Sequence, residues 1–211
     1  MEIRANTQLY DTITNSLRDK FKDRQGIHLS DLIFCLRKSY FRKKLEAPPL
    51  TDEQLMLFAT GFAFQAWMFP GQEREYELDG IKCSPDAHGI EFKTTRASMT
   101  KFNVWDMEHW LGQIKGYCKV LGLTEFDLVV LFLMGNYKPP FPSLGIPIHL
   151  TFTPQEIEDN WTYMLGRKSI LEYALTVSIP PVQHTEMSWE GKLCVHRDLQ
   201  CKDFHCGGID K

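Results

Sequence analysis

Residues 85–93 read Pro-Asp-Ala-His-Gly-Ile-Glu-Phe-Lys, which predicts a turn followed by a short strand. Side chains on a strand point alternately to its two faces. Glu91 and Lys93 therefore project to the same side, while Phe92 points the other way into a core. The stretch thus predicts a strand with one charged side and one buried side.

The turn before this strand carries a second carboxylate, Asp86. Asp and Gly favour turns, so a hairpin closing over His88 and Gly89 would return Asp86 to the neighbourhood of Glu91. Hard cations such as Mg²⁺ or Mn²⁺ take oxygen ligands, often one or two carboxylates, so Asp86 and Glu91 suit such an ion. Lys93 would polarise a water molecule there. On the tripeptide alone, a solvated surface charge pair is the commoner interpretation.

The composition indicates one folded domain. The chain has 211 residues, 43% of them apolar, which is enough for a full core. A net charge of -3 argues against a globally basic nucleic-acid binder but not against a local basic patch. The sequence contains no long apolar segment and no apolar signal core, so we expect a soluble, intracellular, cytoplasmic protein without membrane association.

The apolar periodicity and the turn residues predict an α/β fold, a small mixed sheet of about four or five strands flanked by helices. We expect helices at 9–23, 30–44, 52–69, 105–121 and 154–176, and strands at 73–78, 81–84, 90–94, 126–134 and 148–152. Ser30 should cap the second helix. The third helix lacks a wide polar face, which predicts burial against the sheet. The strand at 126–134 reads as buried and central, and the strand at 148–152 as an edge.

Gln113 and Tyr117 lie four residues apart on the expected helix at 105–121, so both face one side. By themselves they would be ordinary surface and packing residues. Pro-Asp, then Glu-x-Lys, then Gln-x-x-x-Tyr in this order resembles the RecB-like branch of the PD-(D/E)XK nuclease superfamily. The resemblance implies a restriction-endonuclease-like core in which Gln113 and Tyr117 contact the lysine, a metal-bound water or DNA.

The same resemblance points to an earlier helix. Such nucleases usually carry a metal-binding histidine in a Gly-x-x-x-His pattern, and here Gly61 is followed by Gln65 at that place. An amide oxygen can coordinate a hard cation, but it carries no negative charge and cannot act as a base. We therefore expect Asp86, Glu91, the Phe92 carbonyl and Gln65 to hold the ion. A glutamine that simply hydrogen-bonds within its helix is an equally good interpretation of Gln65.

Four cysteines occur at the two ends of the chain, at Cys35, Cys194, Cys201 and Cys206. They resemble the iron-sulfur staple of CRISPR-associated RecB-like exonucleases, in which a 4Fe-4S cluster ties an early helix to the C-terminal tail. Trp189 just before the first tail cysteine adds to the resemblance. Four thiolates also suit tetrahedral zinc, and His196 and His205 are substitute ligands. The resemblance favours iron-sulfur over zinc, with 30–45 and 182–211 forming a cluster-binding appendage of one nuclease domain, 1–211.

Cys83 and Cys118 lie within an expected strand and an expected helix. We interpret both as small buried hydrophobic residues.

A basic run with aromatic residues follows Cys35. Alone, such a run is more often a solvated helix face, but beside a nuclease centre it would contact phosphates and stack on unpaired bases. The residues expected to bind DNA are Arg37, Lys38, Tyr40, Arg42, Lys43 and Lys44.

The sequence and the resemblance together predict a Mg²⁺- or Mn²⁺-dependent DNA nuclease acting on single strands or ends, as an exonuclease. Asp86, Glu91, Lys93, Gln113 and Tyr117 would form its catalytic set. An alternative is a catalytically weak DNA-binding subunit of a recombination or CRISPR spacer-acquisition complex. Gln65, in the place of the usual metal-binding histidine, would be the sign of the weakened metal centre. A third interpretation, a zinc-stabilised interaction protein, would make the motif series accidental. The resemblance also allows a homo-oligomer and CRISPR adaptation proteins as partners.

Overall fold

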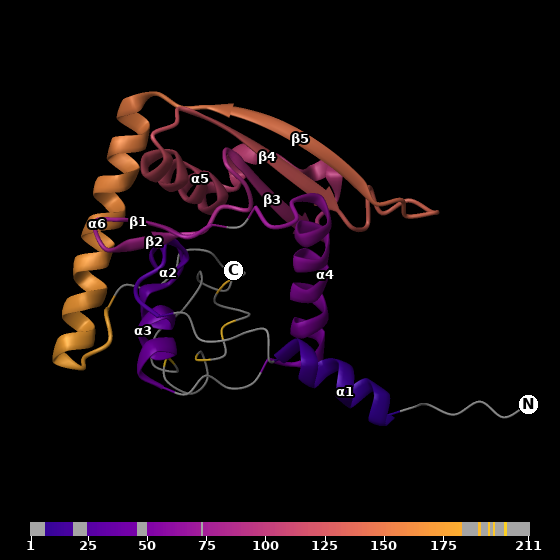
Figure 1. Ribbon diagram of the computed structural model, residues 1–211, viewed down its shortest axis with the longest axis horizontal. Helices are drawn as coiled ribbons and strands as arrows, with labels where there is room; N and C mark the ends of the chain where they lie inside the picture. The colour runs from indigo at the N-terminus through magenta and orange to yellow at the C-terminus, as the bar shows by residue number, and fades with distance from the viewer. Residues whose placement is uncertain are drawn as a thin grey trace, which may run out of the picture.

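The computed structural model describes residues 7–18, 25–45, 50–72, 74–182, 190, 194, 196 and 201. The α-helices are α1 (Thr7–Arg18), α2 (Leu29–Ile33), α3 (Leu36–Lys44), α4 (Asp52–Met68), α5 (Glu108–Leu121) and α6 (Pro154–Val177). The strands are β1 (Tyr76–Leu78), β2 (Ile81–Cys83), β3 (Ile90–Thr95), β4 (Glu125–Phe132) and β5 (Leu144–Thr151). Short 3₁₀ turns at Met99–Lys101 and Val104–Asp106 precede α5. Figure 1 shows the arrangement.

The strands form two sheets rather than the single mixed sheet that we expected. One sheet has the order β3-β4-β5, with β3 parallel and β5 antiparallel to β4, and the other is the β1-β2 hairpin. The edge of β2 is occupied by the N-terminal segment, because the Lys82 N–H donates to the Ile27 carbonyl at 2.8 Å. This pairing gives β2 a backbone partner from a distant part of the chain, and β2 is not part of the larger sheet.

The core lies between the larger sheet, α5 and α6. Side chains along β4 alternate, and Phe126, Leu128, Val130 and Phe132 are all at most 1% exposed. They belong to the same apolar cluster as residues of α5 and α6, including the fully buried Trp161. The central position predicted for this strand is confirmed. Its other face carries exposed residues, so complete burial was wrong.

The prediction that the third helix is buried is also wrong. Of the residues of α4, only Leu55 is buried, although the helix is apolar nearly all round. Figure 1 shows α4 projecting away from the end of the sheet beside β3. Contact is made where Gly61 passes over β3, since a Cβ at Gly61 would lie 3.4 Å from Thr94 Oγ1. Tertiary placement, not periodicity, decides how much of this helix is covered.

The helix expected at 30–44 is two helices, with a break at Phe34 and Cys35. Phe34 is extended, with φ -89° and ψ -173°. Arg167 from α6 donates to the Phe34 carbonyl at 2.5 Å and also to the Leu32 carbonyl. The Cys35 N–H donates to Glu190 Oε1 at 3.0 Å. Long-range partners thus take the backbone groups that a continuous helix would have paired.

The start of this region is likewise shifted from our expectation. Ser30 lies inside α2 rather than capping it, and the residue before the helix is His28. The Asp31 carboxylate accepts from the His28 N–H at 3.0 Å, which satisfies a donor at the helix start. The cap is therefore supplied from within the helix.

The last two helices follow their expected bounds closely. Gly122 ends α5 with a φ of 68°, a left-handed conformation that favours glycine. Thr153 caps α6 by accepting from the Glu156 N–H at 3.2 Å. Among the described residues, no helix is both long enough and apolar enough to cross a membrane.

Candidate active site

The hairpin predicted over His88 and Gly89 is present. Ala87 and Ile90 exchange both backbone hydrogen bonds at 3.2 Å, and Gly89 has a φ of 76°. The turn brings Asp86 back onto β3, where its Oδ2 accepts from the Phe92 N–H at 2.6 Å. His88 is exposed at the turn.

A continuous series of hydrogen bonds joins the predicted catalytic residues of β3 and α5. Lys93 Nζ donates to a Glu91 carboxylate oxygen and, at 2.8 Å, to Gln113 Oε1. Gln113 Nε2 donates to the Tyr117 hydroxyl at 2.5 Å. The structure therefore brings together four side chains that the order of motifs had grouped, and both Glu91 and Gln113 hold the lysine ammonium.

Tyr117 closes the series inside the protein. Its side chain is 4% exposed, and its hydroxyl donates to the Ser84 carbonyl at 3.4 Å. Burial, followed by the negative charge of Glu91, raises the pKa of Tyr117 well above its usual value. The phenol stays protonated at neutral pH and orients Gln113 rather than acting as a base.

One carboxylate oxygen of Glu91 is in a position that a hard cation would satisfy. Glu91 is 3% exposed, and within the described residues its Oε2 is buried without a hydrogen-bond partner. Such an atom is costly unless something satisfies it, and a divalent cation that prefers oxygen ligands would do so. The described residues contain no group of three or more His, Cys, Asp or Glu side chains arranged to hold a metal ion. The remaining ligands would have to be of another kind.

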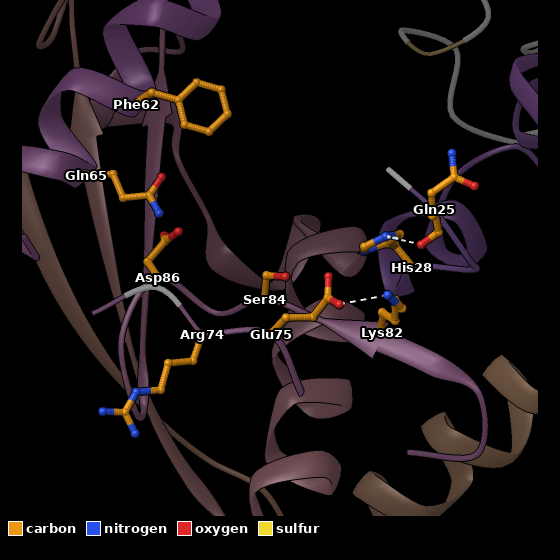
Figure 2. Close-up of a pocket in the computed structure, with 9 residues that line it drawn as sticks. All are labelled: Gln25, His28, Phe62, Gln65, Arg74, Glu75, Lys82, Ser84 and Asp86. Atoms are coloured by element: carbon orange, nitrogen blue, oxygen red, sulfur yellow. Dashed lines mark hydrogen bonds and ion pairs between the residues drawn. The ribbon is translucent and has the colours of Figure 1, made fainter. Parts of the chain in front are cut away.

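Gln65 is one candidate for such a neutral ligand. It lines the same pocket as Asp86, and Figure 2 shows its amide pointing toward the Asp86 carboxylate. Phe92, whose carbonyl is the other neutral ligand we expect, lies on β3 directly after Glu91. The side chain of Phe92 packs in the opposite direction, 6.3 Å from the Phe64 ring by centroids.

The pocket beside Asp86 has a volume of about 410 Å³. Figure 2 shows α4 on one side of it and the segment with Gln25 and His28 on the other. The residues that line it are Gln25, His28, Phe62, Gln65, Arg74, Glu75, Lys82, Ser84 and Asp86. A ligand in this pocket would lie directly beside one of the two candidate metal-binding carboxylates.

His109 belongs to this region and was missed from the sequence. Burial, with a smaller contribution from the charge of Lys93, lowers the pKa of His109 to about 4. Its ring also lies 5.9 Å from that of Phe34, by centroids. His109 precedes Gln113 by four residues and Tyr117 by eight, so helical spacing could have placed it on the same face.

The basic run after Cys35 is more internal than expected. Arg37 is 4% exposed and Tyr40 5% exposed. Arg37 donates to the Pro181 carbonyl at 3.0 Å and to Cys201 Sγ at 3.5 Å. Arg37 thus holds α3 against the C-terminal segment. DNA binding by Arg37 or Tyr40 would require these side chains to become exposed.

The other cations of this run keep part of their side chains in solvent while pairing within the protein. Arg42 and Lys43 both form ion pairs with Asp31, which is 1% exposed. Lys38 lies 3.8 Å from Glu190, and Lys44 donates to Ser178 at 3.1 Å. DNA binding by Lys38, Arg42, Lys43 and Lys44 stays a prediction.

Of the four cysteines expected to bind a cluster, Cys35 and Cys201 both act electrostatically on Cys194. Burial raises the pKa of Cys194, the thiolate charges of Cys35 and Cys201 raise it further, and the His196 backbone and Lys38 lower it. Cys206, like Trp189 and His205, lies outside the described residues. The thiols at both ends of the chain are thus within electrostatic reach of each other.

The other two cysteines confirm their prediction as buried residues. Cys83 and Cys118 are 2% and 0% exposed. Burial raises the pKa of Cys83 to about 12 and that of Cys118 to about 11. Neither thiol is available as a thiolate ligand at neutral pH.

Comparisons with known proteins define the fold. No protein-family profile and no curated protein sequence matches this chain. The crystal structure of SSO0001 matches with a TM-score of 0.52 and 14% identity, covering 90% of this chain and 95% of that one. A phage-related exonuclease from Haemophilus somnus 129PT matches with a TM-score of 0.47 and 10% identity, covering 79% and 99%. The alkaline exonuclease LHK-Exo from Laribacter hongkongensis has a TM-score of 0.42 and 12% identity, covering 72% and 91%. The chain shares its α/β fold with SSO0001.

Proposed function

We propose that this protein is a metal-dependent DNA nuclease that hydrolyses phosphodiester bonds in single strands or at DNA ends. The observation that carries the proposal is the hydrogen-bonded series from Glu91 through Lys93 and Gln113 to Tyr117. The series begins at Glu91, whose Oε2 is buried and lacks a hydrogen-bond partner within the described residues. A surface charge pair would require neither this burial nor this lysine positioning.

Asp86 and Glu91 would hold Mg²⁺ or Mn²⁺, joined by Gln65 and the Phe92 carbonyl. The bound ion would supply Lewis acidity to a phosphoryl oxygen and lower the pKa of a coordinated water. Lys93 would direct its ammonium toward charge that develops on the phosphate, held in place by Glu91 and Gln113. Tyr117 would keep the Gln113 amide in the orientation that presents its oxygen to the lysine.

Cleavage of labelled single-stranded DNA with Mg²⁺ or Mn²⁺ tests the proposal. Wild-type protein should cut, while Glu91→Gln and Lys93→Ala should bind the strand without cutting it. Lys119→Ala is a matched control, because Lys119 lies on α5 but pairs with Glu158 at the surface. Circular dichroism should show all three variants folded. Metal-independent cutting, or cutting by Lys93→Ala at the wild-type rate, would contradict the proposal.

The second candidate function is a DNA-binding subunit with a weak catalytic centre. Gln65 favours it, because a neutral amide leaves Asp86 and Glu91 as the two anionic ligands of the expected set. Binding of DNA with no cutting under any divalent cation would support this function. Gln65→His would then be expected to produce Mn²⁺-dependent cutting, whereas a nuclease that already cuts should change only in metal affinity.

We further propose that Cys35, Cys194, Cys201 and Cys206 hold a 4Fe-4S cluster. The electrostatic effect of Cys35 and Cys201 on Cys194 supports the grouping. A cluster would fix the C-terminal segment against α3 in the same place as the Arg37 and Glu190 contacts. Protein purified without oxygen should absorb near about 400 nm through thiolate-to-iron charge transfer, and Cys194→Ser should lose that band. Colourless protein with bound zinc would overturn the cluster and support the zinc site.

The remaining expectations rest on this proposal. Lys38, Arg42, Lys43 and Lys44 would contact DNA phosphates at the exposed parts of α3. Self-association, and partners from recombination or CRISPR adaptation, stay predictions that the proposed chemistry neither needs nor excludes.

A further inference from the structure

The pocket beside Asp86 is larger than a metal site needs. With about 410 Å³, it falls in the range of small-molecule sites, about 300 to 1,000 Å³. Its lining comes from the segment before α2, from α4 and from the β1-β2 hairpin with the turn after it. Figure 2 shows the space between these parts, with Asp86 and Ser84 at its floor. A ligand there would touch the candidate metal site at one end only.

Of the nine lining residues, four are Gln, Ser or His, four are Arg, Lys, Glu or Asp, and the ninth is Phe62. The amides of Gln25 and Gln65 and the Ser84 hydroxyl each carry donor and acceptor atoms, and the His28 imidazole lies beside them with its Nε2 3.2 Å from the Gln25 carbonyl. This mixture matches the edge of a nucleobase and the hydroxyl and ring oxygens of a sugar. It does not match a bare phosphate, which would select for cations.

The charged residues of the pocket support the same conclusion. Lys82 Nζ lies 2.8 Å from Glu75 Oε1, so its charge is already balanced inside the pocket. Arg74 is exposed, and Figure 2 shows its guanidinium directed away from the space between α4 and His28. Arg74 is therefore placed to meet a phosphate at the rim, not in the interior.

An aromatic ring completes the pocket. Phe62 projects from α4 with 45% of its surface exposed, and Figure 2 shows its ring beside the open space. Every nucleobase has a π-face, so an exposed aromatic side chain binds unpaired bases regardless of sequence. A base that lies on Phe62 would have Gln65, one turn further along the same helix, next to it.

We propose that this pocket binds one unpaired nucleotide of a DNA strand. Its base would lie on Phe62, its sugar and base edges would meet the uncharged polar groups, and its phosphate would reach the site at Asp86. A base in a duplex is stacked and paired, so it would have to leave the helix to enter. The inference deepens the proposed nuclease function and rests on it for the position of the phosphate.

The experiment compares two phenylalanines on α4. Phe62 lines the pocket, while Phe58 lies one helical turn earlier, is 44% exposed and is outside the pocket lining. Binding is measured in EDTA, where no cutting occurs, with a single-stranded oligonucleotide carrying 2-aminopurine and with a blunt duplex of the same sequence. Phe62→Ala should weaken single-strand binding about tenfold and abolish 2-aminopurine quenching, with less than about twofold effect on the duplex. Phe58→Ala should behave as wild type, and Phe62→Trp should restore binding.

The outcomes separate this inference from the proposed function. Unchanged single-strand binding by Phe62→Ala, or equal losses for Phe58→Ala or for the duplex, would overturn the pocket assignment even if the wild-type protein cuts DNA. A wild-type protein that never cuts, but binds single strands in a Phe62-dependent way, would overturn the nuclease and leave the pocket standing. Circular dichroism of Phe62→Trp and Phe62→Ala confirms that both are folded.

Discussion

Two regions differ in how far along the chain their hydrogen-bond partners lie. They are the hairpin at 85–93 and the helix break at Phe34 and Cys35. Asp86 bonds the Phe92 N–H six residues away, and Lys93 bonds Gln113 twenty residues away. At the break, the Phe34 carbonyl accepts a hydrogen bond from Arg167, 133 residues away. The Cys35 N–H donates to Glu190, 155 residues away. The hairpin is a local structure, and the break exists only within the folded tertiary structure.

Because of this difference, we expect changes in the two regions to affect different properties, namely catalysis and the stability of the fold. Changes in the hairpin should reduce catalysis while leaving the fold nearly intact, because its turn is encoded by its own residues. Changes at the break should reduce stability, because buried backbone carbonyls would lose the partners that replace helical hydrogen bonds. The following experiments test that separation, beginning with the largest expected effect.

Asp86→Asn should reduce DNA cleavage about 10³-fold, equivalent to about 4 kcal/mol at the transition state, because it removes one of two anionic metal ligands. The amide can still accept from the Phe92 N–H, so the free energy of unfolding should change by less than about 1 kcal/mol. Rates from single-turnover cleavage and urea denaturation provide the two values. Asp127→Asn, an exposed acid on neighbouring β4, is the control. A loss of stability as large as the loss of rate would show that the hairpin is not locally determined.

Arg167→Ala should lower the free energy of unfolding by about 3 kcal/mol, because the buried Leu32 carbonyl and the partly buried Phe34 carbonyl both lose a charged donor. Urea denaturation monitored by circular dichroism measures the change. Tyr173→Ala on the same helix is 70% exposed and should cost less than about 0.5 kcal/mol. An unchanged midpoint for Arg167→Ala would mean that the break is set by its own sequence.

Gly116 and Gly112 form a matched pair on α5, the helix that joins the two regions. An added Cβ at Gly116 would lie 2.5 Å from Cδ2 of buried Leu29 in α2, whereas the nearest atom to one at Gly112 is 3.5 Å away. Gly116→Ala should destabilise by about 1 to 2 kcal/mol, since overpacking outweighs the gain in helix propensity. Gly112→Ala should stabilise by up to about 1 kcal/mol. Equal effects in thermal unfolding would show that α2 yields to α5 without cost.

His109 lies between the two regions, near Phe34 and Lys93, and should have the smallest effect. Its pKa of about 4 in the folded protein is below its ordinary value of 6.5, so the unfolded state binds more protons between these values. Stability should therefore fall as pH drops from 6.5 toward 4, and His109→Gln should reduce that slope. Urea midpoints at several pH values measure it.

His149 gives the control of opposite sign for this experiment. A hydrogen bond to Asp127 raises the pKa of exposed His149 above its ordinary value. Its contribution to stability is present below the unfolded pKa and is lost as pH rises through the folded value. His149→Gln should therefore lower stability at acidic pH, and a matching decrease for His109→Gln would contradict burial as the cause.

Much of the fold follows from local rules. Gly122 ended α5 where a left-handed residue was needed, Thr153 began α6, and Gly89 allowed the turn before β3. These signals act within a few residues, so they are visible in a sequence. Helical spacing placed Gln113 and Tyr117 on one face, and the same rule applied one turn earlier would have found His109.

Three expectations failed for a common reason. The helix break at Phe34, the exposure of α4 and the burial of Arg37 all depend on what lies beside them in the tertiary structure. Apolar periodicity shows that a face can be buried, but not that a partner reaches it. A charged residue in a basic run looks solvated until a distant segment such as Pro181 covers it.

The sequence by itself determined the hairpin, the facing of Glu91 and Lys93, and the ends of α5 and α6, because each depends on backbone geometry over a few residues. Tertiary structure alone decided that the strands divide into two sheets, that α2 and α3 separate, and that Asp86 borders a pocket with Phe62. Those outcomes depend on which distant groups satisfy buried backbone atoms and which surfaces meet. Such pairings are selected by the free energy of the whole fold, not by any one segment.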